Sequence, residues 1–290
     1  MASMDTGGRR LHLVWRIAIV FGAATLIWLF IHWMGDALFG SGYDRGRHVA
    51  SAVAATALAV PMVVLAYRHL DRLPWSGLRR ASPGTVGRLL LLGMAGYLIP
   101  AGLAVAAITA TGGLTIGLRG SLAEAVLSVL ALVVLVFLYE ALPEELVFRG
   151  YLFRNLATAL PRWAAVLAQA ALFTLFGVVV GAAGSVDRIV LFFAFAYVQG
   201  VIRAVTDTLW VPVGFHLAFQ TAEQIVGPFW DRFAVSDLDL LQQIALGLIP
   251  LALGVFTVQA LWGRTGDPSH PGGARPAWWR RRRGGRPRRG

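Results

Sequence analysis

The feature that most constrains this chain is a series of long apolar runs, each of about 20 residues. A helix rises 1.5 Å per residue, so a run of this length crosses the ~30 Å hydrocarbon core of a membrane. The runs are continuous and lack the alternating pattern of a transmembrane β-barrel strand. We therefore predict an all-α, polytopic membrane bundle of about eight transmembrane helices, at Ile17–Met34, Val49–Tyr67, Leu89–Ile108, Ala125–Leu142, Trp163–Ala183, Ile189–Val205, Leu209–Gly227 and Ile244–Trp262.

The composition excludes several other classes of protein. Hydrophobic residues make up 57% of the 290 residues and charged residues only 14%, whereas soluble domains carry about 25% charged residues. A soluble globular enzyme and a disordered chain are therefore excluded. Cysteine is absent, which also excludes a disulfide scaffold, a thiolate nucleophile and a cysteine-ligated zinc site.

The arginines indicate how the helices are oriented, because cytoplasmic loops retain positive charge. All 26 basic residues are arginines, which fits a GC-rich genome. Alternate connections, counted from the N-terminal segment, hold 21 of them, and the other connections hold 5. We therefore expect an integral protein of a bacterial-type plasma membrane with both termini in the cytoplasm.

The chain divides into four regions. Residues 1–121 form an N-terminal three-span region, residues 122–227 form a core that holds the polar motifs, and residues 228–262 hold the last span. Residues 263–290 form an arginine-rich, disordered cytoplasmic tail, whose composition cannot build a core. We expect this tail either to be simply solvated or to bind anionic lipid headgroups at about 1 kcal/mol per charge. Nucleic acid is not an expected partner, because nothing in the tail reads bases.

The fourth run ends in an unusual cluster that contains Glu140, Glu144, Glu145 and Arg149. Charges at membrane depth cost about 2.5–3.5 kcal/mol each, which favours a functional reason for keeping them. On a helical wheel Arg149 lies about 40° from Glu145 and can pair with it, while Glu144 points elsewhere as a candidate general base. Pro143 predicts a kink beside the carboxylates, because proline lacks an N–H and clashes with the preceding turn. Alternatively, the charges form an ion-paired cap at the membrane boundary.

A second polar pair lies in the seventh run. His216 and Gln220 are four residues apart, about 40° on a helical wheel, so both side chains can reach one target. Both carry N–H donors, which suits them to stabilise an oxyanion. A single histidine in an apolar helix often has only a packing role, and that interpretation stays open here. We expect no zinc site, because the chain lacks the usual helical pair of histidines, and no other cofactor.

Together these motifs resemble those of the CPBP (CAAX protease and bacteriocin-processing) family of intramembrane glutamic endopeptidases. Glu144–Gly150 is similar to the family's Glu-Glu-x-x-x-Arg motif, and Thr206–Pro212 followed by His216 is similar to its last conserved helix. Gln220 stands where that family usually has Asn or Asp. The likeness covers about residues 122–227 and includes the order and spacing of the helices.

The resemblance implies a mechanism. Glu144 would activate a water for attack on a peptide carbonyl, and His216 and Gln220 would hold the oxyanion. Glu145 and Arg149 would support the site by pairing. The expected substrate is a membrane-associated peptide or protein, and the expected site is a water-filled cavity that is open to the cytoplasmic side and holds both glutamates together with the second polar pair.

The sequence departs from the family at a middle motif, Phe-x-x-x-His, whose histidine shares the work of the glutamate. Counting from Phe176 puts Val180 at the histidine position, and counting from Phe173 puts Gly177 there. Losing one partner of a general-base pair costs about 10²–10⁴-fold in rate. Residues Gly177–Gly181 instead have the small-xxx-small spacing that suits close helix contact.

Three functions are therefore open from the sequence. The first is an intramembrane peptide-bond hydrolase of the CAAX protease type. The second is a catalytically impaired relative that binds a peptide or protein partner, or serves as an immunity-type membrane protein. The third is a transporter or proton path that uses the charged cluster of the fourth run, although no broken-helix inverted repeat is evident.

Overall fold

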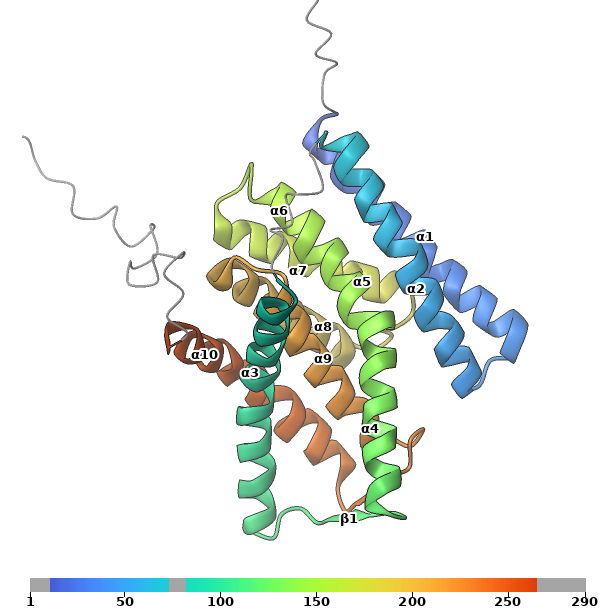
Figure 1. Cartoon of the computed structure of the whole chain (residues 1–290), viewed down its shortest axis with the longest axis vertical. Helices are drawn as coiled ribbons and strands as arrows, with labels where there is room; N and C mark the ends of the chain where they lie inside the picture. Colours follow the sequence, from blue (N-terminus) through green and yellow to red (C-terminus); the bar gives the residue numbers. More distant parts are fainter. Residues whose placement is uncertain (1–10, 73–81, 265–290) are drawn as a thin grey trace, which may run out of the picture.

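The computed structural model describes residues 11–72 and 82–264 (Figure 1). Nearly all of the described chain is helical. The α-helices are α1 (Leu13–Phe39), α2 (Arg45–Leu65), α3 (Pro83–Ala110), α4 (Leu122–Val136), α5 (Leu142–Glu145), α6 (Phe153–Leu156), α7 (Arg162–Val179), α8 (Val186–Thr206), α9 (Trp210–Ile225) and α10 (Ile249–Arg264). The π-helical segments are η1 (Ala66–Leu70), η3 (Phe137–Ala141), η4 (Leu146–Leu152) and η5 (Leu240–Leu248), and two short strands are β1 (Ile116–Leu118) and β2 (Phe233–Val235).

Seven helical segments of the described chain are long and apolar enough to cross a membrane. They correspond to seven of the predicted runs. The remaining predicted run, Leu209–Gly227, forms α9. This helix has 16 residues, is shorter than the seven spanning segments and is largely buried. The chain is therefore an integral membrane protein with an all-α, polytopic bundle, as predicted. The arginine-rich tail after Arg264 lies outside the described residues.

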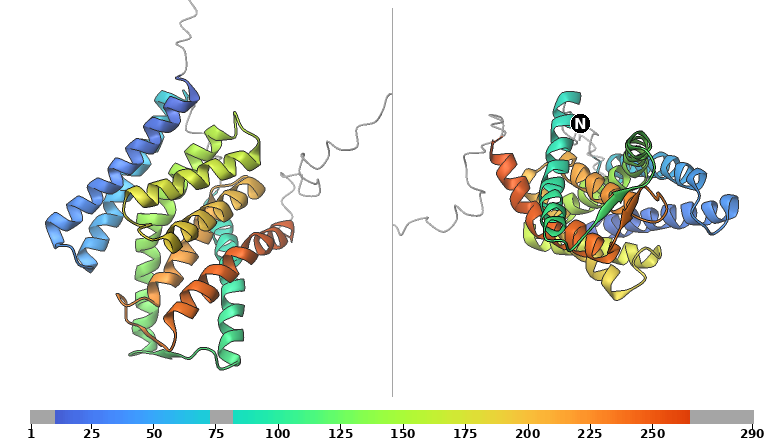
Figure 2. Two further views of the ribbon diagram at one scale, coloured as in Figure 1. Left: turned by 180° about the vertical axis from the view of Figure 1, so that it is seen from behind. Right: turned by 90° about the horizontal axis from the view of Figure 1, so that it is seen from below.

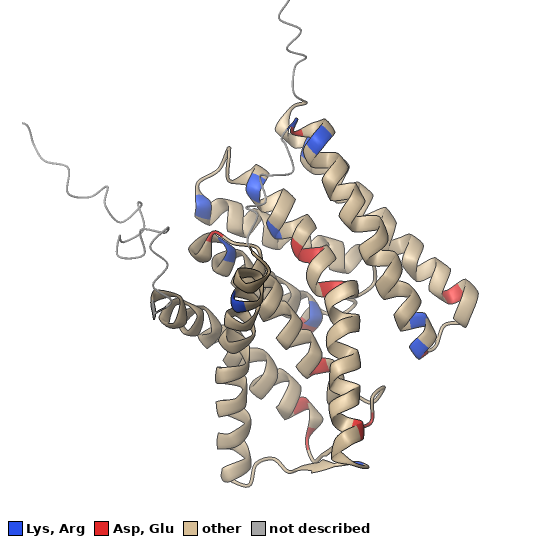
Figure 3. Ribbon diagram, viewed as in Figure 1, with Lys and Arg blue, Asp and Glu red and all other residues tan. Residues whose placement is uncertain are grey.

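The fourth run does not stop at the charged cluster. The elements α4, η3, α5, η4 and α6 form one unbroken helix from Leu122 to Leu156 (Figure 1). Pro143 therefore does not break the helix, because the π-helical turn before it changes the hydrogen-bond pattern: the Leu142 N–H donates to the Phe137 carbonyl. The carbonyl of Leu138 instead accepts from the hydroxyl of Thr56 on α2. Figure 3 shows acidic residues well inside this helix, away from both of its ends.

Two groups of contacts tie the connections together at opposite ends of the bundle. β1 and β2 pair antiparallel, so the α3–α4 and α9–η5 connections lie together (Figure 1). At the other end, the side chain of Arg16, in the first turn of α1, donates hydrogen bonds to Asp71 at 2.5 Å and to Asn155 at 3.0 Å. The paired connections are the same ones that the arginine count assigns to a common side of the membrane.

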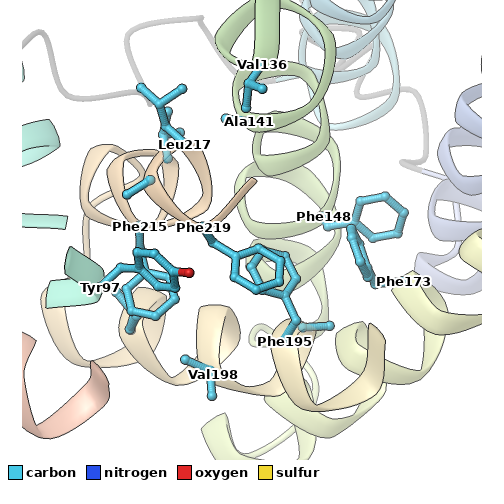
Figure 4. Packing of buried hydrophobic residues seen from close by; sticks show 14 of the residues in the cluster. Tyr97, Val136, Ala141, Phe148, Phe173, Phe195, Val198, Phe215, Leu217 and Phe219 are labelled. Carbon is cyan, nitrogen blue, oxygen red and sulfur yellow. The ribbon is translucent and has the colours of Figure 1, made fainter. Parts of the chain in front are cut away.

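Helix α9 lies in the middle of the bundle, and its residues Val211–Phe219 are all buried. It packs directly on the backbone of α3, because a Cβ at Gly93 would collide with the Val211 carbonyl and one at Gly214 would collide with the Leu90 carbonyl. Around this contact the aromatic rings of α3, α8 and α9 pack edge-on or stacked (Figure 4). The hairpin of α1 and α2 lies along one side of the bundle (Figures 1 and 2). The position of the α9 side chains is thus set by close packing.

Candidate active site

Glu145 is the centre of a buried polar network. Its Oε1 accepts hydrogen bonds from Arg149 Nη1 at 3.0 Å and from Gln199 Nε2 at 3.1 Å, and it lies 2.9 Å from Nδ1 of His216. The side chains of Glu145 and Arg149 are 0% exposed. The predicted pairing of these two residues is therefore confirmed. The ion pair is internal to the bundle and does not form a cap at a helix end.

The contact with Glu145 orients the imidazole of His216. With Nδ1 against Glu145, Nε2 faces Glu144, whose Oε2 lies 4.0 Å away. This distance is too long for a direct hydrogen bond, but one water can bridge it. The ring of Phe195 packs edge-on against the imidazole with 4.7 Å between ring centroids. His216 is therefore fixed on one side, and its second nitrogen is directed at the carboxyl of Glu144.

A cavity of about 210 Å³ lies in front of this pair. One water needs only about 10–15 Å³ of such space, so the cavity has room for several waters or for part of a peptide. Glu144, His216 and Gln220 line it, as expected. Glu145 does not line it, contrary to the expectation, because its Oε1 is held by Arg149, Gln199 and Nδ1 of His216, on the side of the imidazole away from Glu144.

The cavity reaches toward the end of the bundle that carries the α7–α8 turn. Val180 and Ala182 from this turn line it together with Arg188 from the first turn of α8, and Arg188 is exposed. The arginine count assigns this turn to the non-cytoplasmic side, so the arrangement does not agree with the expected opening toward the cytoplasm. The reason is that the helix runs on from Glu144 to Leu156, which places the carboxylates deeper than a helix end would.

Gln220 lines the cavity one turn beyond His216, as their spacing predicted. The carboxyl of Glu140 lines the same cavity. It accepts two hydrogen bonds from Gln224 Nε2, at 2.9 and 3.1 Å. One face of α9 thus presents an imidazole and two amides to the acidic face of the long α4–α6 helix.

The two positions of the predicted middle motif have different surroundings. Val180 lines the cavity at the end of α7. Gly177 packs on α8, and a Cβ there would lie 2.5 Å from the ring of Phe192. Close helix contact is therefore correct for Gly177. It is wrong for Gly181, which lies in the turn with a φ of +81° and where a Cβ would meet no atom within 4 Å.

Sequence reasoning missed two polar residues of this region. Gln199 on α8 donates to Glu145 and, at 3.0 Å, to the Pro212 carbonyl. His32 on α1 lines the cavity. Both are polar residues inside apolar runs, and their burial cost is the signal that could have marked them. Within residues 11–72 and 82–264, no group of three or more His, Asp or Glu side chains is arranged to hold a metal ion.

The chain was compared with known protein families, curated proteins and solved structures. Residues 126–222 match the family model described as Rce1-like, type II CAAX prenyl endopeptidase Rce1-like. No curated protein and no solved structure matches the chain. The matched segment contains every residue of the site proposed from the motifs: Glu144, Glu145, Arg149, His216 and Gln220. The resemblance to the CAAX protease family is therefore confirmed as a similarity over this third of the chain.

Proposed function

We propose that the protein is an intramembrane endopeptidase of the CAAX protease type. The observation that carries this proposal is the pair formed by Glu144 Oε2 and His216 Nε2, 4.0 Å apart on the wall of a cavity inside a membrane bundle. A carboxylate and an imidazole at this separation suit the binding and activation of one water between them. The family match supports the same reaction class.

The proposed step is a hydrolysis. Glu144 takes a proton from the water, and the water oxygen attacks the carbonyl carbon of a peptide bond. The resulting oxyanion accepts hydrogen bonds from the Gln220 amide and from Nε2 of His216 in its imidazolium form, because the Nδ1–H of His216 is directed at the Glu145 carboxylate. Glu144 then returns the proton to the leaving nitrogen as the C–N bond breaks. The products are a carboxylate and an amine.

Glu145 and Arg149 act as positioning residues in this proposal. The Glu145 carboxylate holds Nδ1 of His216, so that Nε2 stays directed into the cavity. Arg149 compensates the charge of Glu145 at 3.0 Å. Such support keeps a catalytic group within the narrow geometry that the reaction needs.

The proposed substrate is a peptide or protein held at the membrane. We further propose a bacterial-type plasma membrane with both termini in the cytoplasm, and binding of the arginine-rich tail to anionic lipid headgroups. With this sidedness, a substrate would reach the cavity from the outer half of the bilayer, because the α7–α8 turn lines its rim.

The test is cleavage of membrane-anchored peptide libraries by the full chain in liposomes, with new peptide ends detected by mass spectrometry. Glu144→Gln removes the proposed base and is expected to lower the rate at least about 10²-fold. Glu124→Gln is the matched control. Glu124 is 55% exposed, and glutamine can replace it in the capping box with Ser121. Equal rates for wild type and Glu144→Gln would contradict the proposal.

A second candidate function is that of a catalytically impaired relative that binds a peptide or a protein partner. The observation that favours it is Val180, an apolar side chain on the cavity wall at the position of the middle-motif histidine. If a missing imidazole limits turnover, Val180→His is expected to raise hydrolysis sharply above that of the wild type. An unchanged rate would argue against this second function.

A further inference from the structure

A second imidazole borders the same cavity, from a helix outside the matched segment. His32 on α1 and His216 on α9 both line it. The Nε2 atom of His32 lies 3.2 Å from the hydroxyl of Tyr139. Val180 at the end of α7 lines the same cavity. The imidazole of His32 therefore borders the cavity that Val180 also lines, and its contact with Tyr139 holds it there.

The surroundings of His32 differ from those of a packing residue. Its neighbour Ile31 is buried, and Trp33 is 65% exposed on the outside of α1. His32 is half-buried between these two extremes. Its hydrogen-bond partner Tyr139 also lines the cavity. Helix α1 therefore turns a polar side chain toward the cavity between apolar neighbours.

Tyr139 connects His32 to the acidic wall. Tyr139, Glu140 and Glu144 belong to one helical stretch, and all three line the cavity. A phenol hydroxyl both donates and accepts, so it can link an imidazole to a water or to a carboxyl. The wall of the cavity thus carries Glu144, an imidazole from α9 and an imidazole–phenol pair from α1 and η3.

We propose that His32, together with Tyr139, is a second water-orienting group of the hydrolytic site, contributed by α1. This inference rests on the proposed function. It assigns to α1 a part of the site that the matched segment lacks, and it explains why a valine at position 180 need not abolish turnover. A water held by the Tyr139 hydroxyl, the His216 imidazole and the Glu144 carboxylate is oriented on three sides before it attacks, and His32 orients the hydroxyl.

The experiment compares kcat, KM and the pH–rate profile of variants of the full chain in liposomes. His32→Ala is expected to lower kcat about 10²-fold with little change in KM, and to alter the acid limb of the profile. Adding Val180→His to the His32→Ala variant is expected to raise kcat at least tenfold above that of His32→Ala alone. If His32 only stabilised the packing of α1, an imidazole at position 180 of α7 would not restore kcat.

His48→Ala is the matched control. His48 is also a buried histidine, 8% exposed, and packs edge-on near Tyr139 at 6.0 Å, but it does not line the cavity. It is expected to keep the wild-type kcat and pH profile. A loss equal to that of His32→Ala would overturn the inference, because it would indicate a general effect on Tyr139.

Two outcomes separate this inference from the proposed function. If Glu144→Gln is inactive while His32→Ala keeps the wild-type kcat, the inference fails and the function stands. If the wild type cleaves no peptide, the proposed function fails. The role of His32 is then tested by NMR of labelled histidine, which follows the titration of the His32 ring. A titration midpoint that differs between wild type and Glu144→Gln supports a shared water, and identical midpoints overturn it.

Discussion

Glu145 illustrates how a charged residue is kept inside a membrane bundle. Arg149, Gln199 and His216 converge on the same oxygen from three parts of the chain. Hydrogen bonds to a charged group contribute about 1.5–3 kcal/mol each, which offsets the cost of removing the carboxylate from water. Oε2 has no hydrogen-bond partner among the described residues. The network therefore depends on one atom.

Removing the cation of this network is expected to be costly. Arg149→Met leaves Glu145 buried without an opposite charge, and breaking a buried pair in this way destabilises a protein by about 3–5 kcal/mol. The measurement is the free energy of unfolding of purified protein in detergent micelles, from denaturant titration.

The control for this prediction is another pair with the same spacing. Arg203 and Asp207 lie 3.1 Å apart, but the Asp207 side chain is 65% exposed. Asp207→Asn keeps a residue that tolerates the φ of 51° found there, and is expected to change stability by about 0.5 kcal/mol or less. If the two variants lost the same free energy of unfolding, burial would not be the reason for the cost of Arg149→Met.

At the scale of helices, the long α4–α6 helix is unusual because it contains a proline and two π-helical segments and still continues. The π-helical turn before Pro143 leaves the Leu138 carbonyl to a hydroxyl of α2. Each such turn carries one more residue than an α-helical turn and so rotates the side chains that follow it. Glu140, Glu144 and Tyr139 come to line one cavity as a result.

The contact between α3 and α9 sets the position of His216 and gives a second prediction. Gly93→Ala places a Cβ against the backbone carbonyl of Val211, which cannot rotate away. Such overpacking costs about 1–3 kcal/mol, and it is expected to lower both the melting temperature in detergent and the rate of hydrolysis.

Gly87→Ala on the same helix is the control. A Cβ at Gly87 has no atom within 4 Å, and alanine is the better helix former by about 1 kcal/mol. This variant is expected to melt at the wild-type temperature or slightly above it. If both variants melt alike, the close approach of α3 and α9 is not what holds α9 in place.

At the scale of the whole molecule, the two ends of the bundle differ in how they are held. One end has the β1–β2 ribbon, and the other has the group formed by Arg16, Asp71 and Asn155. Tyr151 donates to the same Asp71 at 3.2 Å. Each end thus joins segments that the arginine count places on a common side.

The absence of cysteine allows this sidedness to be tested directly, since any introduced thiol is unique. Gly42 lies in the exposed α1–α2 turn and Ala159 in the exposed α6–α7 turn. A membrane-impermeant maleimide is expected to label Gly42→Cys in intact cells and Ala159→Cys only after the membrane is opened. The reverse pattern would invert the proposed topology.

Several parts of this protein follow from the sequence alone. The apolar runs determined an all-α membrane bundle, because a lipid environment leaves few other ways to satisfy the backbone. The wheel positions of Glu145 and Arg149 determined their ion pair, since both lie on one helix. The four-residue spacing of His216 and Gln220 likewise determined that both reach one cavity.

Only the tertiary structure decided which helices meet around that cavity. The contact of His216 with Glu145 joins residues 71 positions apart, and His32 reaches Tyr139 over 107 positions. A helical wheel contains no information about neighbouring helices. The depth of the carboxylates in the bundle also depends on the tertiary structure. The hydroxyl of Thr56 on α2 donates to the Leu138 carbonyl in the turn that lets the helix continue beyond Pro143.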